Sequence, residues 1–261
     1  MTSPSSVIED IQVAGKEKVY FASDFHLGAP DWHSSFDREK KIIRWLEEIQ
    51  TDAKAIFLLG DIFDFWFEYK HTVPRGFIRF LGKIAELRDQ GIPIYFFTGN
   101  HDMWMFDYFP QELNIPIIKE PQSISINGKP LLIGHGDGLG PGDSFYKFLK
   151  NIFSNTFFQW IFHRVHPNLS MGIAKYWSKT SRIAGQKKDE EFKGENEWLL
   201  QYSREKEMIR HHDLYIFGHR HLPLELDVSE QSKYINLGEW MNHYTYLEVN
   251  EKEAVLKTFD A

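Results

Sequence analysis

The chain contains no cysteine among its 261 residues. Disulfide bonds and thiolate metal ligands are therefore excluded, and this absence is typical of proteins from a reducing compartment. No run of about 18 apolar residues, the length that spans a bilayer, occurs in the sequence. Residues 1–15 have neither a basic region nor an apolar core, so they do not resemble a secretory signal. These absences predict a cytoplasmic protein that meets a membrane, if at all, from its surface.

Positive charge is concentrated in one part of the chain. Hydrophobic residues make up 42% of the sequence and aromatic residues 16%, enough for a large core, and the length fits one domain with a sizeable insertion. Residues 140–188 carry a formal charge of +7, whereas the whole chain carries −7. The remainder is therefore strongly acidic and would repel a long polyanion, so we expect no nucleic acid partner.

Five apolar runs of strand type each end at a short group of polar residues with metal-binding side chains. In chain order, the runs 19–22, 56–59, 94–97, 131–133 and 214–217 lead into Asp24-Phe25-His26, Gly60-Asp61, Gly99-Asn100-His101-Asp102, Gly134-His135 and Gly218-His219-Arg220-His221. Ligands of open α/β sheets bind beyond the carboxyl ends of the strands. We therefore expect these side chains to converge on one site.

The residue types at these strand ends suit a pair of divalent cations. Two such ions about 3.5–4 Å apart need a bridging carboxylate and further ligands that leave positions open for water and substrate. Asp61 follows Gly60 with no histidine beside it, which suits the bridge. Imidazole favours zinc or iron, and carboxylate or amide oxygen favours manganese or magnesium. The sequence therefore predicts two metal ions without selecting one element.

A single histidine or aspartate after a strand is usually structural or solvated, but seven candidates at successive strand ends are not expected by chance. The remaining histidines lack this placement, and for them we keep the structural or surface interpretation. They are His33, His71, His163, His166, His211, His212 and His243.

Strands alternate with helical patterns through the first half of the chain, which predicts parallel pairing with helices packed on the sheet. Asn127-Gly128 predicts a hairpin between two strands. The strand-like segments 234–237, 244–249 and 254–259 are expected to form a second, more antiparallel sheet packed on the first. The predicted fold class is α/β, a four-layer α/β/β/α sandwich with a helical cap insertion.

Residues 140–188 combine their basic charge with ten aromatic residues. Such a helical segment can bury its apolar face among lipid headgroups while its cations contact anionic lipids. The alternative is an ordinary helical insertion whose aromatic side chains pack on the core and whose lysines are solvated.

The ordered series Asp-x-His, Gly-Asp, Gly-Asn-His-Asp, Gly-His and Gly-His-x-His resembles the calcineurin-like metallophosphoesterases, and it spans Asp24 to His221. The resemblance implies the four-layer sandwich and two metal ions, manganese first, with iron, zinc or magnesium as alternatives. It assigns Asp24, His26, Asp61 and His221 to one ion, and Asp61, Asn100, His135 and His219 to the other.

Further motifs resemble one branch, the UDP-2,3-diacylglucosamine diphosphatases of lipid A synthesis. They are Gly60-Asp61-Ile62-Phe63-Asp64-Phe65-Trp66, His135-Gly136-Asp137, Gly142-Asp143-Ser144-Phe145-Tyr146 and Leu237-Gly238-Glu239-Trp240. The resemblance implies hydrolysis of this lipid-linked nucleotide diphosphate to UMP and 2,3-diacylglucosamine 1-phosphate by attack of metal-bound water. It also implies a core of residues 1–139 and 189–261, an acyl-binding cap of residues 140–188, and a peripheral place on the inner face of the inner membrane.

The same resemblance assigns catalysis to His101, oriented by Asp102. It assigns substrate contacts to Asn100, His101, Asp137, Asp143, Ser178, Lys179 and Arg182. Position 101 departs from the proteobacterial branch, which has Gly-Asn-Arg-Asp where this chain has Gly-Asn-His-Asp. The exact substrate therefore stays open, with another phosphomonoester or phosphodiester, or a non-catalytic membrane or partner module, as alternatives.

Overall fold

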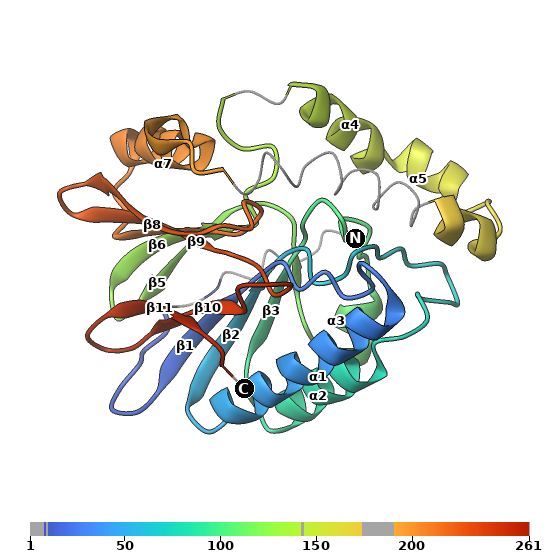
Figure 1. Ribbon diagram of the computed structural model, residues 1–261, viewed down its shortest axis with the longest axis horizontal. Coiled ribbons are helices and arrows are strands. Elements are labelled where there is room, and N and C mark those ends of the chain that lie inside the picture. Colours follow the sequence, from blue (N-terminus) through green and yellow to red (C-terminus); the bar gives the residue numbers. More distant parts are fainter. Residues whose placement is uncertain (1–7, 9, 142–143, 174–190, 261) are drawn as a thin grey trace.

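The computed structural model describes residues 8, 10–141, 144–173 and 191–260. Its elements are, in chain order, β1 (Lys18–Ala22), α1 (Trp32–Ile49), β2 (Ala53–Leu59), α2 (Ile78–Asp89), β3 (Ile94–Phe97), α3 (Tyr108–Leu113), β4 (Ile117–Ile118), β5 (Gln122–Ile126), β6 (Lys129–Gly134), α4 (Ser144–Ser154), α5 (Thr156–Phe162), the 3₁₀ turn η1 (Gly194–Asn196), α7 (Trp198–Ile209), β7 (Leu214–Phe217), β8 (Pro223–Ser229), β9 (Ser232–Leu237), β10 (Thr245–Val249) and β11 (Ala254–Thr258). Two sheets lie face to face, and helices cover the outer face of each (Figure 1).

The first sheet has the order β11-β10-β1-β2-β3-β4, and the second has the order β5-β6-β7-β9-β8. Strands β1 to β4 pair in parallel, as do β6, β7 and β9. The predicted four-layer α/β sandwich is confirmed, and so is the hairpin at Asn127-Gly128. One expectation is wrong: β10 and β11 extend the first sheet beside β1 and are not part of the second.

The alternation of side chains along β1 shows how the layers are built. Tyr20 and Ala22 face the helices, whereas Val19 and Phe21 face the second sheet. Both faces are buried because successive strand residues point to opposite sides and each side is covered. The one-face pattern of α1 buries Trp45 with its neighbours on the helix side of this sheet. Helix α7 covers the outer face of the second sheet.

The cap segment lies over one edge of the sandwich (Figure 1). Its described part contains α4, α5 and a helical stretch at residues 167–173. The boundaries of the insertion at 140 and 188 stay a prediction. Of the helices in the described ranges, none combines the length and apolar character that crossing a bilayer requires.

A buried ion pair connects α7 to the loop that follows β7. Arg220 is fully buried, and its Nε and Nη2 donate to the two carboxylate oxygens of Glu197, each at 2.8 Å. Its guanidinium also lies 4.7 Å from the ring centre of Trp198. Because Arg220 stands between His219 and His221, this pair fixes the backbone that carries two candidate ligands.

We expect Glu197→Ala to lower the free energy of unfolding by about 3–5 kcal/mol, because it leaves a guanidinium buried without its carboxylate. Urea denaturation at neutral pH measures the change. Glu17→Ala is the matched control, since Glu17 pairs with Lys54 at the surface and should shift the midpoint little. Equal midpoints for both variants would show that the buried pair does not stabilise the fold.

Candidate metal centre

The predicted ligands stand on sharply turned backbone. Five of the seven have positive φ between 43° and 69°. These are Asp24, His26, Asp61, His219 and His221. Such conformations cost roughly 1 kcal/mol or more each and cluster at functional sites. Hydrogen bonds between neighbouring turns hold them, from Asp24 N–H to the Gly60 carbonyl at 3.0 Å and from Gly218 N–H to the His135 carbonyl at 2.9 Å.

The first group of ligand atoms comes from Asp24, His26, Asp61 and His221, all within 4.8 Å of one another. Nε2 of His26 lies 3.1 Å from Nε2 of His221, 3.6 Å from Oδ1 of Asp24 and 3.7 Å from Oδ2 of Asp61. Oδ1 of Asp24 is buried yet accepts no hydrogen bond from any described residue. A cation among these atoms would satisfy that oxygen, so the group fits a divalent metal.

The second group comes from Asp61, His135 and His219, and it draws on the second sheet. Nε2 of His135 lies 3.4 Å from Oδ2 of Asp61 and 3.3 Å from Oδ1 of Asn100. Its Nδ1 is 2.8 Å from the carbonyl oxygen of Leu59, to which it donates. This bond leaves the lone pair of Nε2 for the site, as is usual for metal-binding histidine.

Opposite charges dominate the electrostatics of the site. Burial raises the pKa of Asp61, but the imidazoles of His135 and His101 outweigh burial and hold that pKa well below its ordinary value. Burial lowers the pKa of His26 and of His135, yet the carboxylates around them raise each pKa to about 10. Without a metal, protons on these two rings supply positive charge that a divalent ion would replace.

Asp102 forms no hydrogen bond with the His101 ring that it was expected to orient. Its carboxylate accepts hydrogen bonds from the backbone N–H groups of Gly99 at 2.7 Å and Ile62 at 2.8 Å, with longer ones from Asp61 and Phe63. These bonds join the loops after β2 and β3. The expectation that Asp102 orients the His101 ring is wrong, because the backbone amides take up its oxygens.

Asp64 occupies the position beside His101 that was expected for Asp102. Nδ1 of His101 is 3.0 Å from the Asp64 carbonyl oxygen and 3.9 Å from its Oδ1. The same Oδ1 is 3.7 Å from Nδ1 of His26. Asp64 follows Asp61 by three residues in a motif noted from the sequence, and that spacing was the available signal.

The remaining predicted residues divide into two sets. Asp137 is buried, and its Oδ2 forms an ion pair at 2.8 Å with Lys150 of α4, which ties the cap to the core. Asp143, Ser178, Lys179 and Arg182 lie outside the described residues.

Comparison with known proteins agrees with this geometry. The family model for calcineurin-like phosphoesterases matches residues 17–223. The chain belongs to this family of metal-dependent phosphoesterases.

Two relatives have the same name, UDP-2,3-diacylglucosamine hydrolase. That of Porphyromonas gingivalis is 36% identical over 259 residues, which cover 94% of this chain and 98% of that protein. That of Actinobacillus succinogenes is 27% identical and covers 90% of this chain and 97% of that protein. A predicted phosphoesterase from Streptococcus pneumoniae is 13% identical with a TM-score of 0.40, covers 94% of this chain and 90% of its own, and adds nothing to the assignment.

We expect metal affinity to rise with pH through the neutral range. The raised pKa values keep His26 and His135 protonated at pH 7, whereas a ligand must be neutral imidazole, so binding expels protons. Calorimetric titration with Mn²⁺ in buffers of different ionisation enthalpy measures the protons released.

His135→Asn should release fewer protons than the wild type, and His243→Asn, outside the site, should release the same number. A binding heat that does not depend on the buffer would contradict the charge balance described for the site.

Proposed function

We propose that this chain hydrolyses the diphosphate of UDP-2,3-diacylglucosamine to UMP and 2,3-diacylglucosamine 1-phosphate. The observation that carries the proposal is the pair of ligand groups that share Asp61. A shared carboxylate can hold two divalent ions close enough to act together on one phosphoryl group. The names of the two relatives supply the substrate, because this chain aligns with both over most of their length.

In this proposal Asp24, His26, Asp61 and His221 hold one ion, and Asp61, Asn100, His135 and His219 hold the other. The donor set of imidazole, carboxylate and amide, without thiolate, fits manganese first, with iron, zinc and magnesium as alternatives. When bound, the two ions supply Lewis acidity and a water of lowered pKa. The turns between the strands hold the ligands in place, and binding of the ions displaces the protons of His26 and His135.

His101 is assigned to the reacting phosphoryl group. Its ring lies edge to face with His26, at 4.9 Å between ring centres. Burial lowers its pKa below the ordinary value, so the ring takes a second proton only when an anionic group approaches. It then donates to a phosphoryl oxygen or to the leaving group. Because the leaving phosphate has a second pKa of about 6, charge stabilisation matters more than acid strength.

The cap is assigned to the lipid part of the substrate and to the membrane surface. Phe153 and Phe162 of α4 and α5 pack on Trp104, which follows the His101 loop, so an aromatic layer joins this loop to the cap. Phe157 and Phe158 of α5 are 61% and 46% exposed. We assign the inner aromatic layer to acyl chains and the outer face to a bilayer, on the cytoplasmic side of the membrane where the nucleotide substrate would be reached.

The test is UMP release from UDP-2,3-diacylglucosamine in detergent micelles with added Mn²⁺. We expect release by the wild type, none above background by Asp61→Ala, and wild-type release by Asp37→Asn, which changes an exposed carboxylate of α1. Cleavage of bis(p-nitrophenyl) phosphate without UMP release would keep the phosphoesterase chemistry and rule out this substrate.

We expect His101→Ala to lower turnover by about 10² to 10⁴ while both metal ions are retained. Metal content by mass spectrometry and turnover are measured on the same sample, so that loss of the site and loss of the proton donor are separated. Turnover equal to that of the wild type would remove His101 from the mechanism.

A further inference from the structure

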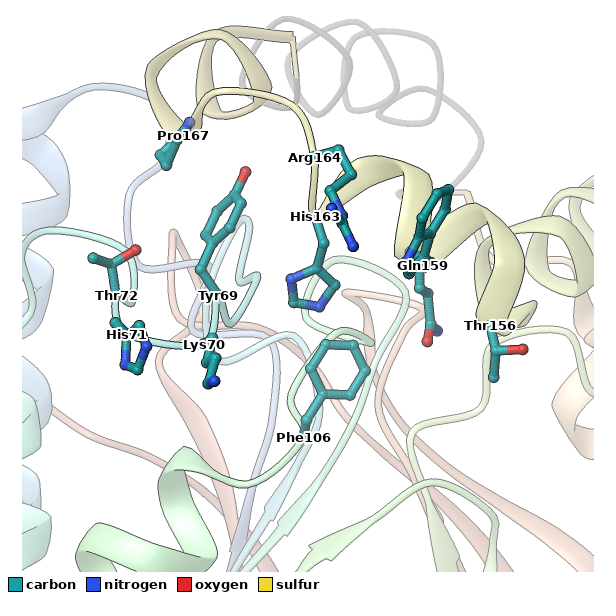
Figure 2. Close-up of a pocket in the computed structure, with 11 residues that line it drawn as sticks. Tyr69, Lys70, His71, Thr72, Phe106, Thr156, Gln159, His163, Arg164 and Pro167 are labelled. Atoms are coloured by element: carbon teal, nitrogen blue, oxygen red, sulfur yellow. The ribbon is translucent and has the colours of Figure 1, made fainter.

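A pocket outside the metal centre lies where the cap meets the core, and we call it the seam pocket. Its volume is about 690 Å³, within the range of ligand sites. Figure 2 shows the core side chains on one wall and those of α5 and the following turn on the other. The lining residues are Tyr69, Lys70, His71, Thr72, Phe106, Thr156, Gln159, Trp160, His163, Arg164 and Pro167. None is acidic and none is a candidate metal ligand.

A tight turn builds the core wall of the seam pocket. The N–H of Tyr69 donates to the carbonyl of Thr72 at 2.9 Å, which leaves Lys70 and His71 exposed at the tip of the turn. The Tyr69 hydroxyl hydrogen-bonds to Ser170, which is fully buried in the cap. The turn that carries Lys70 is therefore held against the cap.

The cap wall adds positive charge and flat aromatic surface. Arg164 lies 4.7 Å from the ring centre of Trp160. His163 stacks on Phe106 with ring centres 6.1 Å apart. No carboxylate of the described residues pairs with Lys70 or Arg164. In a chain of net charge −7, this gathering of cations without acids is suited to an anion.

An exposed apolar face adjoins the seam pocket on α5. Thr156, Trp160 and Arg164 follow one another at intervals of four residues and line the pocket. On the outer side of the helix, Phe157 is 61% exposed and Ile161 42% exposed. Cations beside a solvent-exposed aromatic and aliphatic face are the arrangement of helices that lie in the headgroup layer of a membrane.

We propose that the seam pocket binds the phosphate of an anionic phospholipid headgroup while Phe157, Phe158 and Ile161 enter the acyl layer beside it. This inference rests on the proposed membrane contact of the cap and gives it a specific site. Arg164 of the cap and Lys70 of the core bind the phosphate from opposite walls of the pocket, so both parts of the chain contact the same lipid. The lipid is distinct from the substrate, because the pocket lining includes neither the residues assigned to the metal centre nor Phe153 and Phe162, which are assigned to the acyl chains of the substrate.

Flotation with vesicles tests this site. We compare phosphatidylcholine vesicles with vesicles that also contain phosphatidylglycerol, using the full chain without substrate. Lys70→Gln/Arg164→Gln should weaken binding to the anionic vesicles by about 30-fold, the effect of two lost cations at a membrane surface. Lys16→Gln/Lys252→Gln is the matched control, since it removes the same charge from exposed positions outside the pocket and should change binding little.

The outcomes separate this proposal from the function. Equal weakening by both double variants, or equal binding of the wild type to both vesicles, overturns the lipid site. Nuclear magnetic resonance of His163 gives a further test. The lipid site is also overturned if the His163 signals shift on addition of UMP or inorganic phosphate but not on addition of short-chain phosphatidylglycerol. A wild type that binds anionic vesicles through the pocket but releases no UMP from micelles supports the lipid site and overturns the proposed function.

Discussion

The carboxylate of Asp61 lies next to metal-binding histidines that follow strands of both sheets. Its Oδ2 lies 3.7 Å from the His26 nitrogen of the first sheet and 3.4 Å from the His135 nitrogen of the second. Neither sheet alone could supply both neighbours. The sandwich must therefore bring the ends of β1, β2, β6 and β7 to one place, and the buried apolar layer between the sheets, which includes Phe57 and Ile133, sets their separation.

This convergence needs close approach as well as attraction. A side chain at Gly218 would bring its Cβ to 2.5 Å from Oδ2 of Asp24, and one at Gly99 would collide with Asp61. The left-handed turns at the ligands hold conformational strain that the surrounding hydrogen bonds offset. Arg38 contributes to this support, since its buried guanidinium donates to the carbonyl of His26 at 2.6 Å. The glycines, the strained turns and the buried arginine therefore all help to bring the ligand side chains close together.

The sequence was sufficient to predict what local pattern determines, namely the strands, the polar residues at their ends and the helical face around Trp45. It did not predict which sheet takes β10 and β11, because an alternating strand can pair with any free edge. It did not separate Asp64 from Asp102 beside His101, because the two carboxylates differ only in how the loops fold back on each other. The seam pocket was also missed, since Lys70 and Arg164 are far apart in the chain and line one pocket only because the cap packs on the core, through contacts such as that of Tyr69 with Ser170.

The proposed centre requires one chain to hold two metal ions close enough to share the carboxylate of Asp61. Electron paramagnetic resonance of the protein loaded with Mn²⁺ tests it directly, because ions about 3.5–4 Å apart couple magnetically. We expect an exchange-coupled spectrum at two equivalents of Mn²⁺ and an uncoupled one for Asp61→Asn. A wild-type spectrum that shows nothing but the six-line signal of isolated Mn²⁺ ions, at every loading, would contradict the shared site.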